Sequence, residues 1–133
     1  MESEIVKSVD DVVQSYDKNY KVLSIDKLLD LQTKLSTLAY NLSDIVADYK
    51  RDYNKAYYIR KIEVSKQKNA IINLGKSAAY AESQAIEDTA NELSDELQFE
   101  SMTVRLDNKL RQVNKILDGL SQRISYLKEE KKR

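Results

Sequence analysis

The clearest pattern of apolar and polar positions in this chain lies between residues 28 and 49. Apolar side chains recur there at alternating steps of three and four, which is the a/d spacing of a heptad repeat. They are Leu28, Leu31, Leu35, Leu38, Leu42, Ile45 and Tyr49. The positions between them are mostly polar, and neither Gly nor Pro interrupts the stretch. The pattern predicts a long helix whose apolar seam needs a partner helix.

A second heptad pattern in the C-terminal half supplies that partner. Its seam contains one polar position, Thr103, and consists of Phe99, Thr103, Leu106, Leu110, Val113, Leu117, Leu120, Ile124 and Leu127. Gly119 lies beside the seam, where it costs about 1 kcal/mol relative to Ala. It is either a tolerated defect or the mark of a close helix crossing.

The boundaries between the predicted helices follow from turn and cap residues. Gly75 ends the first long pattern, and Ser77 can cap a new helix, so we expect a helix over 24–74, a turn at 75–77 and a second helical arm over 78–130. The Ala-rich residues 78–91 form either a separate short helix, with a break near residue 90, or the start of the long one.

The first 23 residues predict an additional helix. Apolar and aromatic positions recur at helical spacing at Ile5, Val9, Val12, Tyr16 and Tyr20. Either Ser3 or Ser8 could cap this helix, and Ser24 is a plausible cap for the next one. Because the apolar run is short, the helix needs support from packing.

Charge patterning indicates how the two long segments pair. Residues 49–68 are mainly basic and residues 82–100 are acidic without a basic residue. Folding the chain at Gly75 places position n opposite position 150 − n, so the two blocks lie side by side. Further out, the acidic Asp26, Asp30, Asp44 and Asp48 would lie along the basic Arg105, Lys109, Arg111, Lys115 and Arg123. Each exposed pair stabilises the fold by about 0–1 kcal/mol, but together they select the register.

These patterns predict one all-α domain over residues 1–133. We expect a long antiparallel helical hairpin, similar to a coiled coil, with an additional N-terminal helix over 1–23 and a basic tail at 131–133. Pro is absent and Gly occurs twice, which disfavours strand-rich folds.

Composition narrows the possible functions. The chain has no Cys and no His, which removes thiol chemistry, the commonest general base and the commonest metal ligand. We therefore expect no enzymatic activity, no cofactor, no metal site and no small-molecule substrate. The formal net charge is +0, and no signal peptide or membrane span is expected, which indicates a cytoplasmic protein without membrane contact.

One stretch combines aromatic and basic residues. Such residues can stack on bases and neutralise phosphates, or anchor a protein partner. Alternatively, they serve the fold, with Tyr continuing the seam and the basic groups paired to the acidic block. The candidate contact residues are Lys50, Arg51, Tyr53, Lys55, Tyr57, Tyr58, Arg60 and Lys61.

The middle of the chain resembles a class of known proteins. Three segments carry the resemblance, together with the Leu-rich last helix that ends at Ser125-Tyr126-Leu127: Ala56-Tyr57-Tyr58-Ile59-Arg60-Lys61, Gly75-Lys76-Ser77 and Ala81-Glu82-Ser83-Gln84-Ala85. Over roughly residues 50–127 the sequence is similar to small helical proteins of tailed bacteriophages, often encoded near replication or recombination genes. The resemblance implies a phage-encoded protein in the host cytoplasm, and it supplies no catalytic signature.

Two functions are consistent with these observations. The first is a non-enzymatic interaction or structural protein that binds a protein partner or self-associates into an oligomer through its helix faces. The alternative is a nucleic-acid-binding accessory protein of phage replication or recombination that uses the Tyr/Lys/Arg-rich residues within 49–68.

Overall fold

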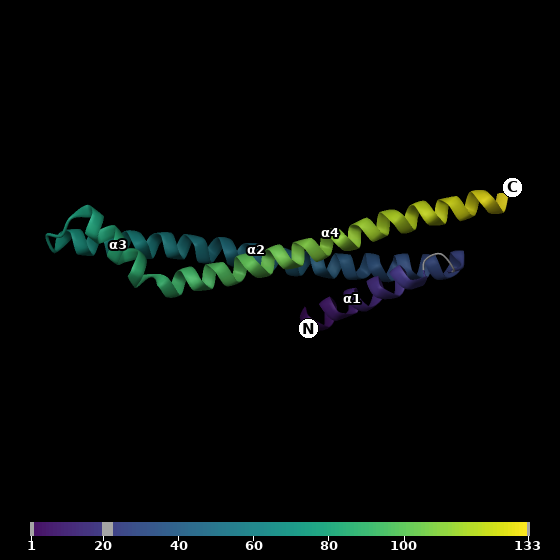
Figure 1. Ribbon diagram of the computed structural model, residues 1–133, viewed down its shortest axis with the longest axis horizontal. Helices are drawn as coiled ribbons and strands as arrows, with labels where there is room; N and C mark the ends of the chain where they lie inside the picture. The colour runs from purple at the N-terminus through teal and green to yellow at the C-terminus, as the bar shows by residue number, and fades with distance from the viewer. Residues whose placement is uncertain (1, 20–22, 133) are drawn as a thin grey trace. The chain divides into compact units, whose positions relative to one another are not determined.

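A computed structural model describes residues 2–19 and 23–132 of the chain. Within these ranges there are four helices and no strand: α1 (Glu2–Asn19), α2 (Ile25–Asn73), α3 (Ala78–Asp88) and α4 (Ala90–Lys132) (Figure 1). The predicted all-α class is therefore confirmed. Tyr20, expected on the first helix, and Arg133, the last residue of the predicted basic tail, lie outside the described residues.

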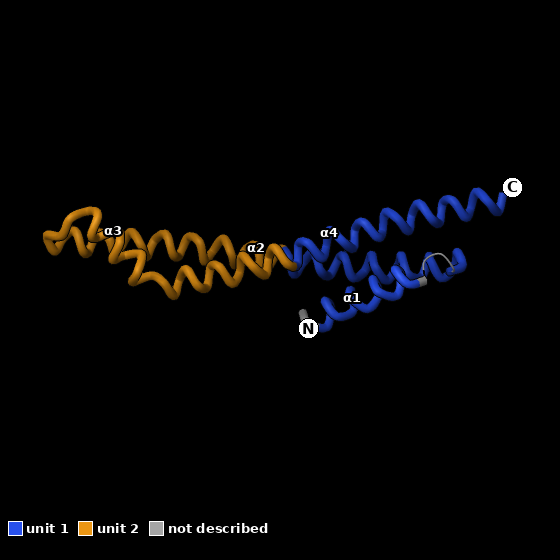
Figure 2. Tube along the Cα trace, in the orientation of Figure 1, with its two compact units in different colours: residues 1–46, 106–133 blue, residues 47–105 orange. Residues whose placement is uncertain are grey.

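The chain divides into two compact units (Figure 2). Unit 1 comprises Met1–Val46 and Leu106–Arg133, and unit 2 comprises Ala47–Arg105. Helices α2 and α4 are each divided between the two units, whereas α1 belongs to unit 1 and α3 to unit 2. No helix in the described ranges is long and apolar enough to cross a membrane.

Polar side chains satisfy backbone groups at the starts of α2 and α3. The Ser24 hydroxyl accepts a hydrogen bond from the backbone N–H of Lys27 at 3.4 Å. The Ser77 hydroxyl accepts one from the backbone N–H of Tyr80 at 3.2 Å. Between α2 and α3, Gly75 has a φ angle of 88°, a conformation that Gly adopts without steric cost. These are the residues from which the sequence predicts helix boundaries.

Thr89 separates α3 from α4. Its hydroxyl donates to the carbonyl oxygen of Ala85 at 2.8 Å, and its backbone N–H also bonds to Ala85. The Ala-rich residues that follow the turn at Gly75 begin with a separate short helix.

All three helices of unit 1 contribute to its core. The buried apolar side chains are Val9 and Val13 of α1, Leu28, Leu35, Ala39, Leu42 and Val46 of α2, and Leu106, Val113, Leu120 and Ile124 of α4. Two sets of predicted seam positions, Leu28, Leu35 and Leu42 on α2 and Leu106, Val113 and Leu120 on α4, are at most 1% exposed.

The remaining seam positions of α2 differ from the prediction. Leu31, Leu38 and Ile45 are half-buried, and Ala39 and Val46 are buried in their place. The a/d pattern assumes one partner helix, whereas α2 in unit 1 contacts two, so its apolar stripe is wider. Leu38 and Val12 of α1 both line a groove.

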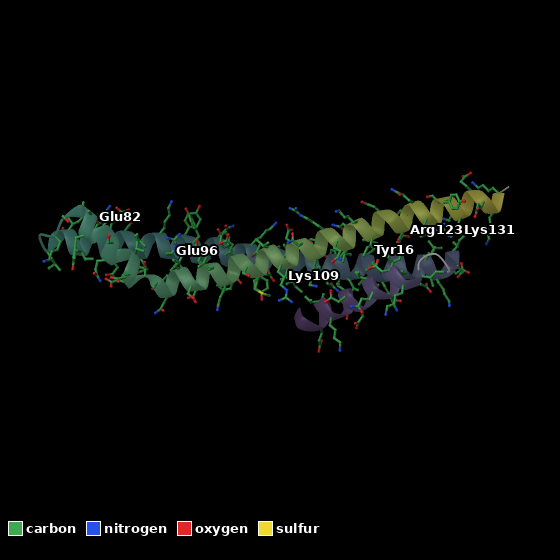
Figure 3. The ribbon with its side chains drawn as sticks, in the orientation of Figure 1. Tyr16, Glu82, Glu96, Lys109, Arg123 and Lys131 are labelled. Carbon is green, nitrogen blue, oxygen red and sulfur yellow. The ribbon has the colours of Figure 1, made fainter. Side chains whose placement is uncertain are left out.

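Helix α1 packs against the part of α4 in unit 1. Lys109 Nζ lies 2.7 Å from Asp10 Oδ1, and the Tyr16 hydroxyl lies near Gly119 (Figure 3). Residue numbers rise together in these contacts, so α1 and this part of α4 run in the same direction. The sequence placed Lys109 along acidic residues of α2, whereas the ion pair that the structure shows for Lys109 is with Asp10 of α1.

The core of unit 2 is thinner. Its buried apolar side chains in the described residues are Ala81 and Ala85. Larger groups are only partly covered, as in the aromatic pair of Tyr49 and Phe99, whose ring centroids lie 6.4 Å apart. Unit 2 therefore leaves much of its apolar surface exposed.

Candidate functional site

A partly buried ion pair of unit 2 joins the basic and acidic blocks. Glu96 of α4, with a side chain 7% exposed, accepts hydrogen bonds from Arg60 Nε and from Arg60 Nη2, the second at 3.4 Å (Figure 3). The hydrogen bond that Arg60 donates to Glu96 is the main cause that raises the pKa of Arg60. This ion pair joins the basic block, residues 49–68, to the acidic block, residues 82–100. Arg60 is also one of the candidate contact residues.

Tyr57 is the centre of a second cluster on α2. Its ring lies at an edge-to-face angle to Tyr58, with centroids 5.5 Å apart. The Arg60 guanidinium and the Lys61 ammonium lie 5.6 and 5.4 Å from the Tyr57 centroid, within the range of a cation–π contact. Tyr57 is half-buried, and its ring contacts side chains of its own helix: Tyr58, Arg60 and Lys61.

Tyr53 is half-buried beside α4. The negative charge of Glu100, followed by burial and by Glu96, raises the pKa of the Tyr53 hydroxyl above its ordinary value of 10.0. Tyr53, Tyr57 and Arg60 form the partly buried half of the predicted site.

The other predicted residues face solvent. Tyr58 is 62% exposed, and the Arg51 side chain is 70% exposed, with Asp48 and Asp52 at 3.3 and 3.9 Å. Lys55 is also exposed, and its spacing places it on one helical face with Arg51 and Tyr58. Lys50 and Lys61 are exposed outside this face. The predicted residues therefore do not converge on one site.

A shallow groove of about 340 Å³ lies beside this face. Ala56, Ile59 and Phe99 form its apolar lining, and its charged lining residues are Asp52, Lys55, Glu92 and Asp95. Glu92 Oε2 is buried without a hydrogen-bond partner. In the described ranges no group of three or more acidic side chains is arranged to hold a metal ion.

The sequence prediction missed an apolar surface on α4. Leu93, Leu97 and Val104 are 37%, 52% and 54% exposed, although each is a large apolar side chain. A groove of about 750 Å³ runs beside Leu93 and Leu97, with Tyr49, Ser94, Gln98, Ser101 and Met102 also in its lining. The predicted seam on α4 begins at Phe99, and a second heptad series, displaced by two residues toward the N-terminus, includes Leu97 and Val104.

The chain matches no family model, no curated protein and no solved structure. A proposal for its function therefore rests on its own residues and surfaces.

Proposed function

We propose that the chain is a non-enzymatic helical interaction protein that acts through its helix faces, first of all by self-association. The observation that carries this proposal is the imbalance in unit 2. Its described residues bury only Ala81 and Ala85 as apolar side chains, while large apolar groups stay exposed, among them Ile59, Ile62, Leu93, Leu97 and Val104. Exposed apolar faces of this kind mark interaction surfaces.

We further propose that α2 and α4 form a long antiparallel hairpin. Three contacts support it, because the position on α4 falls as the position on α2 rises: Gln32 with Ser121 at 2.9 Å, Tyr49 with Phe99, and Arg60 with Glu96. The most buried seam residues fit the same register. Leu28 with Leu120, Leu35 with Val113 and Leu42 with Leu106 each have numbers that add up to 148, as do those of Tyr49 and Phe99.

Sedimentation equilibrium tests the proposed self-association. We expect the average mass to rise with concentration from 15.4 kDa toward twice that value. Loading at about 0.5 mM would reveal a dimer whose Kd is as weak as about 1 mM. A single species of monomer mass over the whole range would overturn the proposal.

A nucleic-acid-binding function is the second candidate, favoured by the exposed face of Arg51, Lys55 and Tyr58. Fluorescence anisotropy with single- and double-stranded DNA tests it at low and moderate salt. Binding that weakens steeply with salt would indicate phosphate contacts. A double variant R51E/K55E should then lose binding, while Lys34→Glu, an exposed site on α2 in unit 1, should retain it. No binding at low salt would eliminate this candidate.

A further inference from the structure

In unit 2, helix α4 carries two heptad series on different sides. The inner series is buried or half-buried and consists of Glu92, Glu96, Phe99 and Thr103. Two residues along an α-helix correspond to a rotation of about 200°, so a series displaced by two positions lies on nearly the opposite side. All members of that outer series are exposed: Ala90, Ser94, Leu97, Ser101 and Val104.

The outer series has the spacing and composition of a helix–helix seam. Its steps are four, three, four and three, as in the a and d positions of a coiled coil, and none of its members is charged. The next positions in the same series are Asn108, Arg111 and Lys115, so the uncharged seam is confined to unit 2. The small Ala and Ser side chains allow a second helix to approach closely, with Leu97 and Val104 as the large contacts.

The charged residues beside the outer seam indicate which helix can pair with it and in which direction. With Ser94 and Ser101 at a positions and Leu97 at a d position, Glu100 is a g residue and Arg105 is the e residue five positions later. In a parallel coiled coil, g residues of one helix pair with e residues of the other, and these pairs set partner choice and orientation. Glu100 and Arg105 are both exposed, and neither forms an ion pair with another described residue.

We propose that two copies of the chain associate in parallel along the outer seam of α4, residues 90–105. Leu97 and Val104 of one copy pack against the same residues of the second copy. Two symmetry-related pairs join Glu100 of either copy to Arg105 of the other. An antiparallel pair would instead bring the Glu100 side of one helix to the Glu100 side of the other, where like charges repel. This inference rests on the proposed self-association and specifies its surface and orientation.

A matched pair of variants tests the surface by sedimentation equilibrium. Leu97→Lys places a charge in the centre of the seam and should weaken dimerisation by about 100-fold or more, comparable to loss of a central interface anchor. Ile62→Lys is the control, because Ile62 is 53% exposed in unit 2 but lies on α2. It should change the dimer Kd by less than about threefold, since substitutions outside the contact surface have small effects.

The outcomes separate this inference from the proposal on which it rests. A wild-type dimer that Leu97→Lys leaves intact would overturn the seam while self-association stands. A wild-type chain that stays monomeric would overturn both. Because Leu97 faces solvent in the single chain, circular dichroism should show unchanged helix content in both variants, which excludes misfolding as the cause of a lost dimer.

Cysteine cross-linking tests the orientation, because the natural sequence has no Cys. In a parallel dimer, Ser101→Cys lies opposite itself and should form an interchain disulfide under mild oxidation, as should Ser94→Cys. Ser65→Cys, at an exposed site on α2 in unit 2, is the control and should remain uncross-linked. Preferential cross-linking between chains with Cys at 94 and chains with Cys at 104, an a position and a d position, would indicate an antiparallel pair and contradict the proposal.

Charge reversal tests the ion pairs. Glu100→Lys alone should weaken the dimer by about tenfold, because two like-charged contacts then replace two ion pairs. The double variant E100K/R105E restores opposite charges across a parallel interface and should recover the wild-type Kd to within about threefold. A double variant as weak as, or weaker than, the single one would contradict the assigned pairing.

Discussion

Glu96 is an unusual residue for a helix seam, because a carboxylate occupies a buried position where apolar side chains are typical. Its charge is matched by Arg60, whose side chain is 26% exposed. A buried ion pair commonly stabilises a fold no more than apolar residues of similar volume do. Its clearer effect is on register, because an uncompensated buried charge penalises any sliding of α4 along α2.

A double-mutant cycle at Arg60 and Glu96 checks this interpretation. Arg60→Met leaves the Glu96 carboxylate without its partner, and should lower the free energy of unfolding by about 2–3 kcal/mol, somewhat less than for a fully buried pair. The double variant R60M/E96L removes both charges and should recover most of that loss. Urea unfolding followed by circular dichroism measures both values. Additive losses in the double variant would show that the pair is not coupled.

Tyr53 gives a prediction for alkaline pH. Its pKa in the folded chain is raised above 10.0, first of all by Glu100. The folded state therefore favours the protonated phenol. This contribution to stability is present below the unfolded-state pKa and is lost as the pH rises through the folded-state pKa. Glu100→Gln should lower the Tyr53 pKa toward 10.0 and reduce the alkaline loss of stability.

NMR titration of tyrosine labelled at the Cζ carbon measures this change, with Tyr53→Phe to assign the signal. Tyr126 is an internal control, because its pKa is raised by a hydrogen bond to Glu130 instead. A Tyr53 midpoint that Glu100→Gln does not move would contradict the assigned cause.

At the scale of helices, the two glycines of the chain have opposite roles. Gly75 has a φ of 88°, a conformation strained for Ala by about 1–2 kcal/mol. Gly119 lies inside α4, where a Cβ atom would be 3.4 Å from the Tyr16 hydroxyl, an ordinary contact distance. Helix α1 thus comes close to α4 at Gly119, and there is room between them for one methyl group.

We therefore expect substitutions by Ala to have opposite signs. Gly75→Ala should lower the free energy of unfolding by about 1–2 kcal/mol, and Gly119→Ala should raise it by up to about 1 kcal/mol, because Ala favours a helix interior. Urea unfolding of the two single variants measures both effects. Destabilisation by Gly119→Ala would mean that α1 cannot accommodate the methyl group.

Sequence patterns predicted the helices better than their faces. Helix caps are local, so Ser24, Gly75 and Ser77 could be identified from neighbouring residues alone. Ala39 and Val46 could not, because their burial depends on how helices that are distant in sequence pack together. The ion pair of Lys109 with Asp10 of α1 could not be predicted for the same reason. The candidate contact residues do not form one site, because Arg60 and Tyr53 lie toward α4, whereas Arg51 and Tyr58 face solvent.

For the whole molecule, the two units differ in how they cover their helices. In unit 1, α1 buries Val9 and Val13, which are 2% and 8% exposed. Unit 2 has no equivalent long helix, and exposes apolar groups on both α2 and α4. The structural role of α1 should therefore be separable from self-association, which we assign to unit 2.

The double variant V9A/V13A tests this separation in the full-length chain. Removing buried methyl groups from α1 should lower the free energy of unfolding of unit 1 by about 2–4 kcal/mol in total. K7A/Q14A, at exposed positions of the same helix, should change it by less than about 0.5 kcal/mol. Hydrogen exchange measured by mass spectrometry resolves the effect by segment.

Faster exchange in residues 25–46 and 106–132, with residues 47–105 and the dimer Kd unchanged, would assign α1 a purely structural role. A weakened dimer at constant helix content would instead make α1 part of the interface, and acceleration throughout the chain would show that the two units unfold as one cooperative body.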